Sequence, residues 1–342
     1  MPKRINNFFR DKIKFSKMLQ AYNRASKSKH YNKEVILFEL DLANNITSIL
    51  KEIYSGTYQS GKYRTFTIYE PKQRIIRALP FKDRVVHQWY VEEFIKKIFV
   101  PKFIYDSYAC LEGKGVHKAI KRLQMYMKKM YIENENFYIL KCDIAKYFYS
   151  IDKHILFNIL KRYAKDKDFL LFTYNLIFDN KEEKGIPIGN YTSQYFANIY
   201  LNELDHFIKE DLKIKYYLRY MDDFVLLVNS KEDTKIIKKK IEEYINQKLK
   251  LNFNNKTNYF PNKNGVKFCG FRIYTNKILL KNDNKKKIYK RVKKWNELYN
   301  KKQLDLKKAY QSMQAWKGHA KHSNSYNYIK KIEKKCLWLY QE

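Results

Sequence analysis

The chain has 342 residues, enough for two or three subdomains around a sizeable core. Lys and Arg number 70 against 35 Asp and Glu, so the net charge is +35 at pH 7. This excess favours a polyanionic partner, although a Lys-, Asn-, Ile- and Tyr-rich composition is also expected of an AT-rich genome. No apolar run reaches membrane-spanning length, no signal peptide is recognisable, and the four scattered cysteines form no CxxC pair. We therefore expect a cytoplasmic protein with reduced thiols and no membrane partner.

The first part of the chain predicts helices followed by a hairpin. Residues 1–55 are charged and helical in pattern. Their apolar side chains form a stripe that we expect to be buried: Ile36, Leu37, Leu40, Leu42, Ile46, Ile49 and Leu50. Two short strands are predicted around residues 63–70 and 73–80, with the turn at Pro71 and Lys72.

The next segments alternate between helices and a strand. Apolar spacing predicts helices over residues 83–99 and 115–132, the second with a strongly basic outer face. An apolar strand then ends at Asp143, and helices are predicted over about residues 153–178.

A long helix and a second hairpin follow. The helix lies within residues 185–210, where Thr192 or Ser193 can cap its start. Residues 216–229 read as strand, tight turn and strand.

The remaining chain predicts one more helix, a strand pair and a basic tail. Ser230 and Asp233 have the spacing of a capping box that opens a helix reaching about residue 250. A strand pair is predicted within residues 258–274, and a basic helical tail from about residue 280. This order of elements suits an antiparallel sheet with helices on one face, so the predicted fold class is α+β.

Three acidic residues stand at predicted strand ends. Asp222 and Asp223 occupy the tip of the 216–229 hairpin, and Asp143 follows the apolar strand 79 residues before Asp222. An isolated Asp-Asp pair is common on solvated turns, so the pair alone is weak evidence. Three carboxylates at strand ends can bind two divalent cations, an arrangement used for in-line nucleotidyl transfer.

With these residues in hand the chain resembles the reverse transcriptases over about residues 60–275. Six motifs carry the resemblance in the expected order. They are RIIRALPFKDRVVHQ at 74–88, Asp143, GIPIGNYTSQYFANIYLNELD at 185–205, YMDD at 220–223, LKLNFNNKTNYF at 249–260 and VKFCGFRIY at 266–274. The resemblance implies a right-hand polymerase with fingers, a palm built on an antiparallel sheet, and a helical thumb. Its implied parts are an N-terminal helical extension at 1–55, fingers at 56–135 and 153–185, palm at 136–152 and 186–275, and thumb at 276–342.

The resemblance also implies a catalytic centre. Asp143 and Asp222 would be the main ligands of two Mg²⁺ ions, for which Mn²⁺ can substitute, with Asp223 beside them and the Ile144 carbonyl as a backbone ligand. Lys256 matches the lysine thought to protonate the departing pyrophosphate, although it is one of many lysines in this chain.

Further positions would bind the incoming nucleotide and the primer. Arg74 is the first candidate for the triphosphate, because a guanidinium matches phosphate oxygens, and Arg77 and Lys114 are weaker candidates. Phe148 stands where the family excludes a ribose 2′-hydroxyl, but it could equally belong to the core. Arg77 could instead pair with a carboxylate such as Glu70. The implied primer grip is Phe268, Cys269, Gly270 and Phe271.

One motif departs from the pattern of most relatives. Ile188 and Gln194 replace the usual Gln before Gly189 and the Pro after Ser193, which makes this segment similar to the enzymes of diversity-generating retroelements. Ile188 and Gly189 would lie against the incoming nucleotide, where an aliphatic contact weakens discrimination. In that family the consequence is misincorporation opposite template adenines.

The resemblance implies partners and leaves alternatives open. The partners would be an RNA template, a DNA or RNA primer, deoxynucleotides, a structured non-coding RNA from the same locus and a small basic accessory protein.

The nearest alternative is a reverse transcriptase of an anti-phage defence system or a retron. More remote alternatives are a DNA-templated polymerase and a non-catalytic RNA-binding protein on a polymerase scaffold. His319 and His322 with Cys336 match no zinc signature, and we expect them to be structural or RNA-facing.

Overall fold

A computed structural model describes residues 7–69, 73–179 and 182–340. The chain forms two compact units, each built from segments that are discontinuous in sequence. The first unit comprises residues 1–110, 144–213 and 239–255, and the second comprises 111–143, 214–238 and 256–342. Within the described ranges, no helix is both long and apolar enough to cross a membrane. Helices and antiparallel sheets occur together, which confirms the α+β class.

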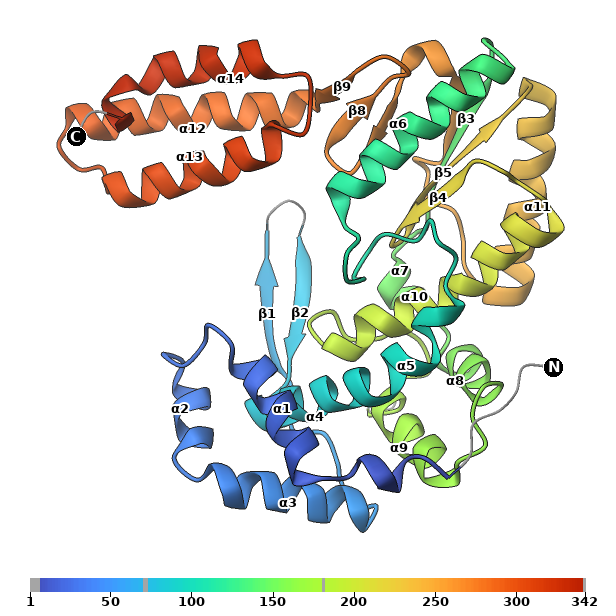
Figure 1. The fold of residues 1–342 in the computed structure, drawn as a ribbon, viewed down its shortest axis with the longest axis vertical. Coiled ribbons are helices and arrows are strands. Elements are labelled where there is room, and N and C mark those ends of the chain that lie inside the picture. The colour runs from blue at the N-terminus through green and yellow to red at the C-terminus, as the bar shows by residue number, and fades with distance from the viewer. Residues whose placement is uncertain (1–6, 70–72, 180–181, 341–342) are drawn as a thin grey trace. The chain divides into compact units, whose positions relative to one another are not determined.

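The first unit is mainly helical (Figure 1). Its core is aromatic: Phe9 lies 5.1 Å from Phe94 and 5.7 Å from Trp89 between ring centroids, and Phe172 closes the cluster. Its helices are α1 Phe15–Ser26, α2 Lys33–Glu39, α3 Leu42–Tyr54, α4 Phe81–Tyr90, α5 Lys96–Ile98, α7 Tyr147–Ser150, α8 Lys153–Lys161, α9 Lys167–Ile177 and α10 Tyr191–His206, with π-helical turns at Val91–Ile95 and Phe207–Asp211.

The apolar stripe predicted for residues 1–55 is only partly buried. Ile46 and Ile49 are in the core, but Leu37 and Leu40 are 57% and 77% exposed. The prediction was wrong there because the segment is not one continuous helix: α2 ends at Glu39 and α3 begins at Leu42. Apolar residues spaced for a single helix therefore do not all fall on one buried face.

The predicted hairpin of the first unit is present as β1 Arg64–Ile68 and β2 Arg74–Ala78, paired antiparallel. The predicted turn residues Pro71 and Lys72 lie outside the described residues.

The start of α10 differs from the prediction. The helix begins at Tyr191, after Asn190, and Asn190 makes no side-chain cap hydrogen bond. Thr192 and Ser193 are inside the first turn and buried, so neither caps the helix. The Thr192 hydroxyl instead lies 2.9 Å from Nδ1 of the buried His87 on α4. The Thr192 side chain therefore makes a long-range contact with α4 and does not cap the helix.

His87 should make the protein sensitive to acid. Burial lowers its pKa from 6.5 to about 4, so between these values the unfolded chain binds a proton that the folded protein does not. The free energy of unfolding should therefore fall by up to about 3 kcal/mol as the pH drops from 6.5 to 4. Denaturant unfolding at pH 7 and pH 4.5 should show a smaller drop for His87→Gln than for the wild type. The exposed His154→Gln is the matched control, and an identical drop in all three proteins would contradict the assignment.

The second unit contains a four-stranded antiparallel sheet in the order β4-β5-β3-β6, with helix α6 (Val116–Glu133) packed against β4 and β5 (Figure 1). Its strands are β3 Tyr138–Asp143, β4 Tyr217–Tyr220, β5 Asp223–Val228 and β6 Asn258–Pro261. After β5, helix α11 spans Lys231–Leu249. The predicted capping box is confirmed, because Ser230 Oγ accepts from the Asp233 backbone N–H and donates to its carboxylate.

Residues 258–274 form three strands instead of the predicted pair. A short 3₁₀ turn at Asn262–Asn264 separates β6 from the hairpin β7 Val266–Phe268 and β8 Phe271–Ile273. The hairpin belongs to a second sheet in the order β7-β8-β9, where β9 is Ile278–Leu280.

The predicted basic helical tail is present as α12 Asn282–Asn300, α13 Leu306–Ala320 and α14 Tyr326–Glu333, followed by a kinked 3₁₀ segment at Lys334–Tyr340 (Figure 1). Cys336 lies in the core of this bundle with Val292 and Met313. His322 instead stacks on His117 of α6, with 3.5 Å between ring centroids. Cys336 is therefore structural, and for the two histidines the expectation of a structural or RNA-facing role stays a prediction.

Candidate active site

The tip of the β4–β5 hairpin is a tight two-residue turn. Tyr220 pairs with Asp223, so Met221 and Asp222 form the connection. Met221 has a φ of 57°, in the left-handed region that a residue with a side chain adopts only at a cost. Its carbonyl oxygen accepts a hydrogen bond of 2.9 Å from Nη1 of Arg219, which is fully buried. Arg219 therefore braces the turn that carries Asp222.

Asp143 lies at the neighbouring strand end. In the β3–β5 register it is paired directly with Asp223. Thr257 Oγ1 accepts from the Asp143 backbone N–H at 3.1 Å and donates to the Asp143 carbonyl at 3.2 Å. This side chain replaces a missing ladder partner and fixes the backbone of the acid. Lys256, the predicted proton donor, is the residue before Thr257 and lies in the turn that leads into β6.

The carboxylate of Asp223 has an unusual environment. Lys141 on β3 places Nζ 3.1 Å from Oδ2 of Asp223. Burial raises the pKa of Asp223 to about 7, the charges of Asp143 and Asp222 act in the same direction, and Lys141 opposes them. Among the described residues, its second oxygen, Oδ1, is buried with no hydrogen-bond partner.

This donor set fits a divalent cation. Carboxylate oxygens are the hard ligands that Mg²⁺ and Mn²⁺ prefer, and a buried carboxylate oxygen without a partner is satisfied by an ion. In the described part of the chain, however, no three His, Cys, Asp or Glu side chains converge as they stand on one ion position. The acids thus share one sheet edge without forming a closed three-ligand cage.

The predicted primer grip lies in the same unit. Phe268 and Phe271 are buried on either side of the β7–β8 turn, where Cys269 and Gly270 both have positive φ. Burial raises the pKa of the Cys269 thiol, and the nearby Asp223 charge raises it further. The Gly270 carbonyl accepts from Asn284 Nδ2 at 3.2 Å, which attaches the turn to α12.

Three nucleotide-binding candidates meet in the first unit. The Arg77 backbone N–H donates to the Ile188 carbonyl at 2.9 Å. Gly189 has a φ of 132°, and a Cβ there would lie 2.6 Å from the Arg77 carbonyl oxygen, so only glycine fits. The Arg77 guanidinium makes two bonds of 3.2 Å to Glu182. The sequence suggested Glu70 as a possible partner, but Glu70 lies outside the described residues.

The other candidates are placed as follows. Arg74 is exposed at the start of β2, and Phe148 is half-buried in α7, with its carbonyl accepting from the Ile186 N–H at 2.8 Å. Ile144 is buried and forms an isolated β-bridge with Phe253 in the first unit. Lys114 lies in the second unit, two residues before α6, and its N–H donates to the Leu111 carbonyl.

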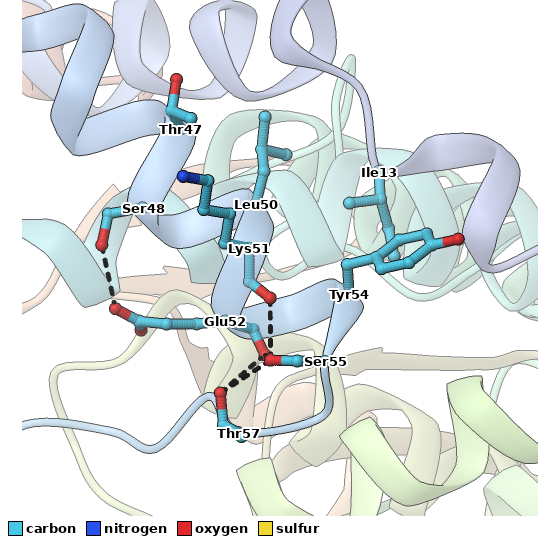
Figure 2. Close-up of a pocket in the computed structure, with 9 residues that line it drawn as sticks. All are labelled: Ile13, Thr47, Ser48, Leu50, Lys51, Glu52, Tyr54, Ser55 and Thr57. Atoms are coloured by element: carbon cyan, nitrogen blue, oxygen red, sulfur yellow. Dashed lines mark hydrogen bonds between the residues drawn. The ribbon is translucent and has the colours of Figure 1, made fainter.

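A separate hollow of about 590 Å³ lies beside α3 in the first unit (Figure 2). Its polar groups bond to one another: Ser48 donates to Glu52, and Ser55 bonds to the Lys51 carbonyl and to Thr57. None of the predicted site residues lines it. It lacks the convergent polar groups of a ligand site, so the strand-end acids remain the candidate centre.

Comparison with known proteins decides the family. Residues 67–273 match the sequence profile of the family described as reverse transcriptase (RNA-dependent DNA polymerase). The chain belongs to the reverse transcriptase family. The matched segment contains Asp143, Asp222, Asp223 and Lys256, together with the primer-grip turn. Enzymes of this family generally use divalent metals, in agreement with the donor set at the strand ends.

Individual relatives of this reverse transcriptase are distant. The group II intron-encoded protein LtrA of Lactococcus lactis subsp. cremoris is 23% identical over 305 residues, covering 67% of this chain and 49% of that protein. The putative COX1/OXI3 intron 2 protein of Saccharomyces cerevisiae is 22% identical over 279 residues, covering 63% of this chain and 31% of that protein. The chain thus spans about half or less of the length of these relatives.

Solved structures similar to this reverse transcriptase include two telomerases. Apo telomerase from Candida tropicalis, truncated from its C-terminal domain, gives a TM-score of 0.49 at 15% identity, covering 68% of this chain and 59% of that one. Telomerase from Candida albicans, in complex with a fragment of telomeric RNA, gives 0.46 at 11% identity, covering 68% and 50%.

Proposed function

We propose that the protein is an RNA-directed DNA polymerase that makes cDNA by two-metal nucleotidyl transfer with Mg²⁺. The observation that carries the proposal is the pairing of Asp143 with Asp223 at adjacent strand ends, beside Asp222 on a braced turn, in a chain of this family. Its substrates would be an RNA template, a DNA or RNA primer and deoxynucleotides. The net charge of +35 suits a nucleic acid duplex.

Each residue would have a distinct part in the reaction. Asp143 and Asp222 would hold the ions, which, when bound, lower the pKa of the primer 3′-hydroxyl and neutralise the leaving pyrophosphate. Thr257 and Arg219 keep the backbones of the two acidic segments in place. Lys256 would deliver a proton to the pyrophosphate.

Other residues would contact the nucleotide and the primer. Arg74 would bind the triphosphate through its guanidinium, with Arg77 and Lys114 as further cations. Phe148 would stand against the ribose and exclude a 2′-hydroxyl. The primer end would rest on the turn of Cys269 and Gly270.

We further propose that synthesis is error-prone at template adenines, as in diversity-generating retroelements. Ile188 offers an aliphatic side chain where most relatives have Gln. The next residue, Gly189, lets this segment lie close to the backbone of Arg77, where a larger residue would clash. Ile188→Gln should restore one polar contact worth about 1 kcal/mol, which corresponds to about fivefold fewer errors at template adenines. Sequencing of cDNA from both proteins on one RNA measures this. An unchanged error spectrum would remove Ile188 from the nucleotide site.

The purified protein should be tested on RNA from its own locus, with Asp222→Asn as the control. Adenine-specific errors in a product that requires Asp222 would support the diversity-generating assignment and the accompanying partners, a structured RNA and a small basic protein. Faithful or repetitive cDNA would keep the polymerase and favour a defence system or a retron. A complete lack of product would favour the non-catalytic alternative.

A further inference from the structure

Lys141 lies inside the candidate centre and has no assigned role. It precedes Asp143 by two residues on β3, so both side chains project from the same face of the sheet. The side chains of Lys141 and Asp223 are only 24% and 27% exposed. Nζ of Lys141 lies 3.1 Å from Oδ2 of Asp223. Lysine is seldom this buried without a counter-charge, and here the counter-charge is one of the three acids.

The acids themselves explain why a cation is needed there. Asp143 and Asp223 are paired in register, and Asp222 is the turn residue before Asp223, so three carboxyl groups share one sheet edge. When ionised without a nearby cation, they repel one another. The ammonium of Lys141 neutralises one of them and holds Asp223 in the β3–β5 sheet. Asp143 and Asp222 then remain the main metal ligands of the proposed function, in agreement with the absence of a three-ligand cage among the described residues.

We propose that Lys141 is a positioning residue, an internal counter-cation that occupies Oδ2 of Asp223 and competes with metal coordination by this carboxylate. The inference rests on the proposed function, because it concerns the same centre. Lys141 stabilises the metal-free protein and weakens divalent-ion binding, since removing it frees Asp223 as a third carboxylate ligand and removes a nearby positive charge.

The test is a titration with Mn²⁺ alone, followed by electron paramagnetic resonance, together with thermal unfolding in EDTA. Lys141→Met keeps the length of the side chain and removes its charge. It should lower the Kd for Mn²⁺ by about three- to tenfold and lower the Tm of the metal-free protein by several degrees. Lys141→Arg keeps the positive charge, so its Kd for Mn²⁺ and the Tm of its metal-free form should be close to those of the wild type. Lys263→Met removes the same charge from an exposed position in the same unit and should change neither.

A second pair of variants keeps the test decisive if Lys141→Met folds poorly. In the background of Asp223→Asn, Lys141→Met should no longer tighten Mn²⁺ binding, because the carboxylate that it frees is absent. Unchanged or weaker Mn²⁺ binding by Lys141→Met, in a protein that still binds Mn²⁺ through Asp222, would overturn the inference about Lys141. It would leave the proposed function standing. If Asp222→Asn leaves Mn²⁺ binding intact, the proposed function fails as well.

Discussion

Replacing Asp222 with Asn should lower cDNA synthesis by about a thousandfold or more and leave RNA binding within about twofold. Asn has the same shape, so the two-residue turn and its Arg219 bond should persist. It lacks the negative charge that a divalent ion requires, and the reaction loses stabilisation of its transition state. RNA binding depends on many Lys and Arg side chains, and one charge in a protein of +35 changes it little.

The measurements are primer extension on an RNA template and equilibrium binding of the same RNA at fixed salt. Asp211→Asn is the matched control, because Asp211 is exposed at the end of the π-helical turn after α10 and lies outside the predicted site. It should keep full synthesis. Wild-type rates in Asp222→Asn would exclude Asp222 as a metal ligand, and a loss of RNA binding would instead indicate a folding defect.

The strand-end acids could be predicted because their signals are local. Each follows an apolar run with strand-like spacing, and the register that pairs Asp143 with Asp223 confirms that two such ends meet. The Ser230 capping box was equally local, and it was confirmed.

The supporting residues could not be predicted, because their partners lie far along the chain or depend on burial. Thr257 bonds to Asp143 across 114 positions, and a threonine in a polar stretch gives no sign of this. Arg219 and Lys141 stand in apolar strands and are easily taken for solvated positions. A charged residue within such a strand can indicate a buried partner, since a charged side chain on a buried sheet seldom reaches water.

Arg219→Met should cause the second-largest effect, on both stability and synthesis. The fully buried guanidinium donates to the carbonyl of Met221, a residue held at a φ of 57°. Met fills much of the same volume but has no donor, so the carbonyl loses its partner at a cost of about 1–3 kcal/mol. The turn then relaxes, and a displacement of Asp222 by about 1 Å can cost about a hundredfold in rate.

Denaturant unfolding and primer extension over a range of Mg²⁺ concentrations separate the two effects. Arg272→Met is the matched control, because Arg272 also donates to a backbone carbonyl, that of Asn264, but at a half-buried position on β8. It should lose well under 1 kcal/mol and keep its rate. Arg219→Lys retains one donor and should recover part of the stability. If Arg219→Met folds as stably as Arg272→Met and extends primers at the wild-type rate, the turn is rigid by itself. Arg219 would then be a core residue with no part in placing Asp222.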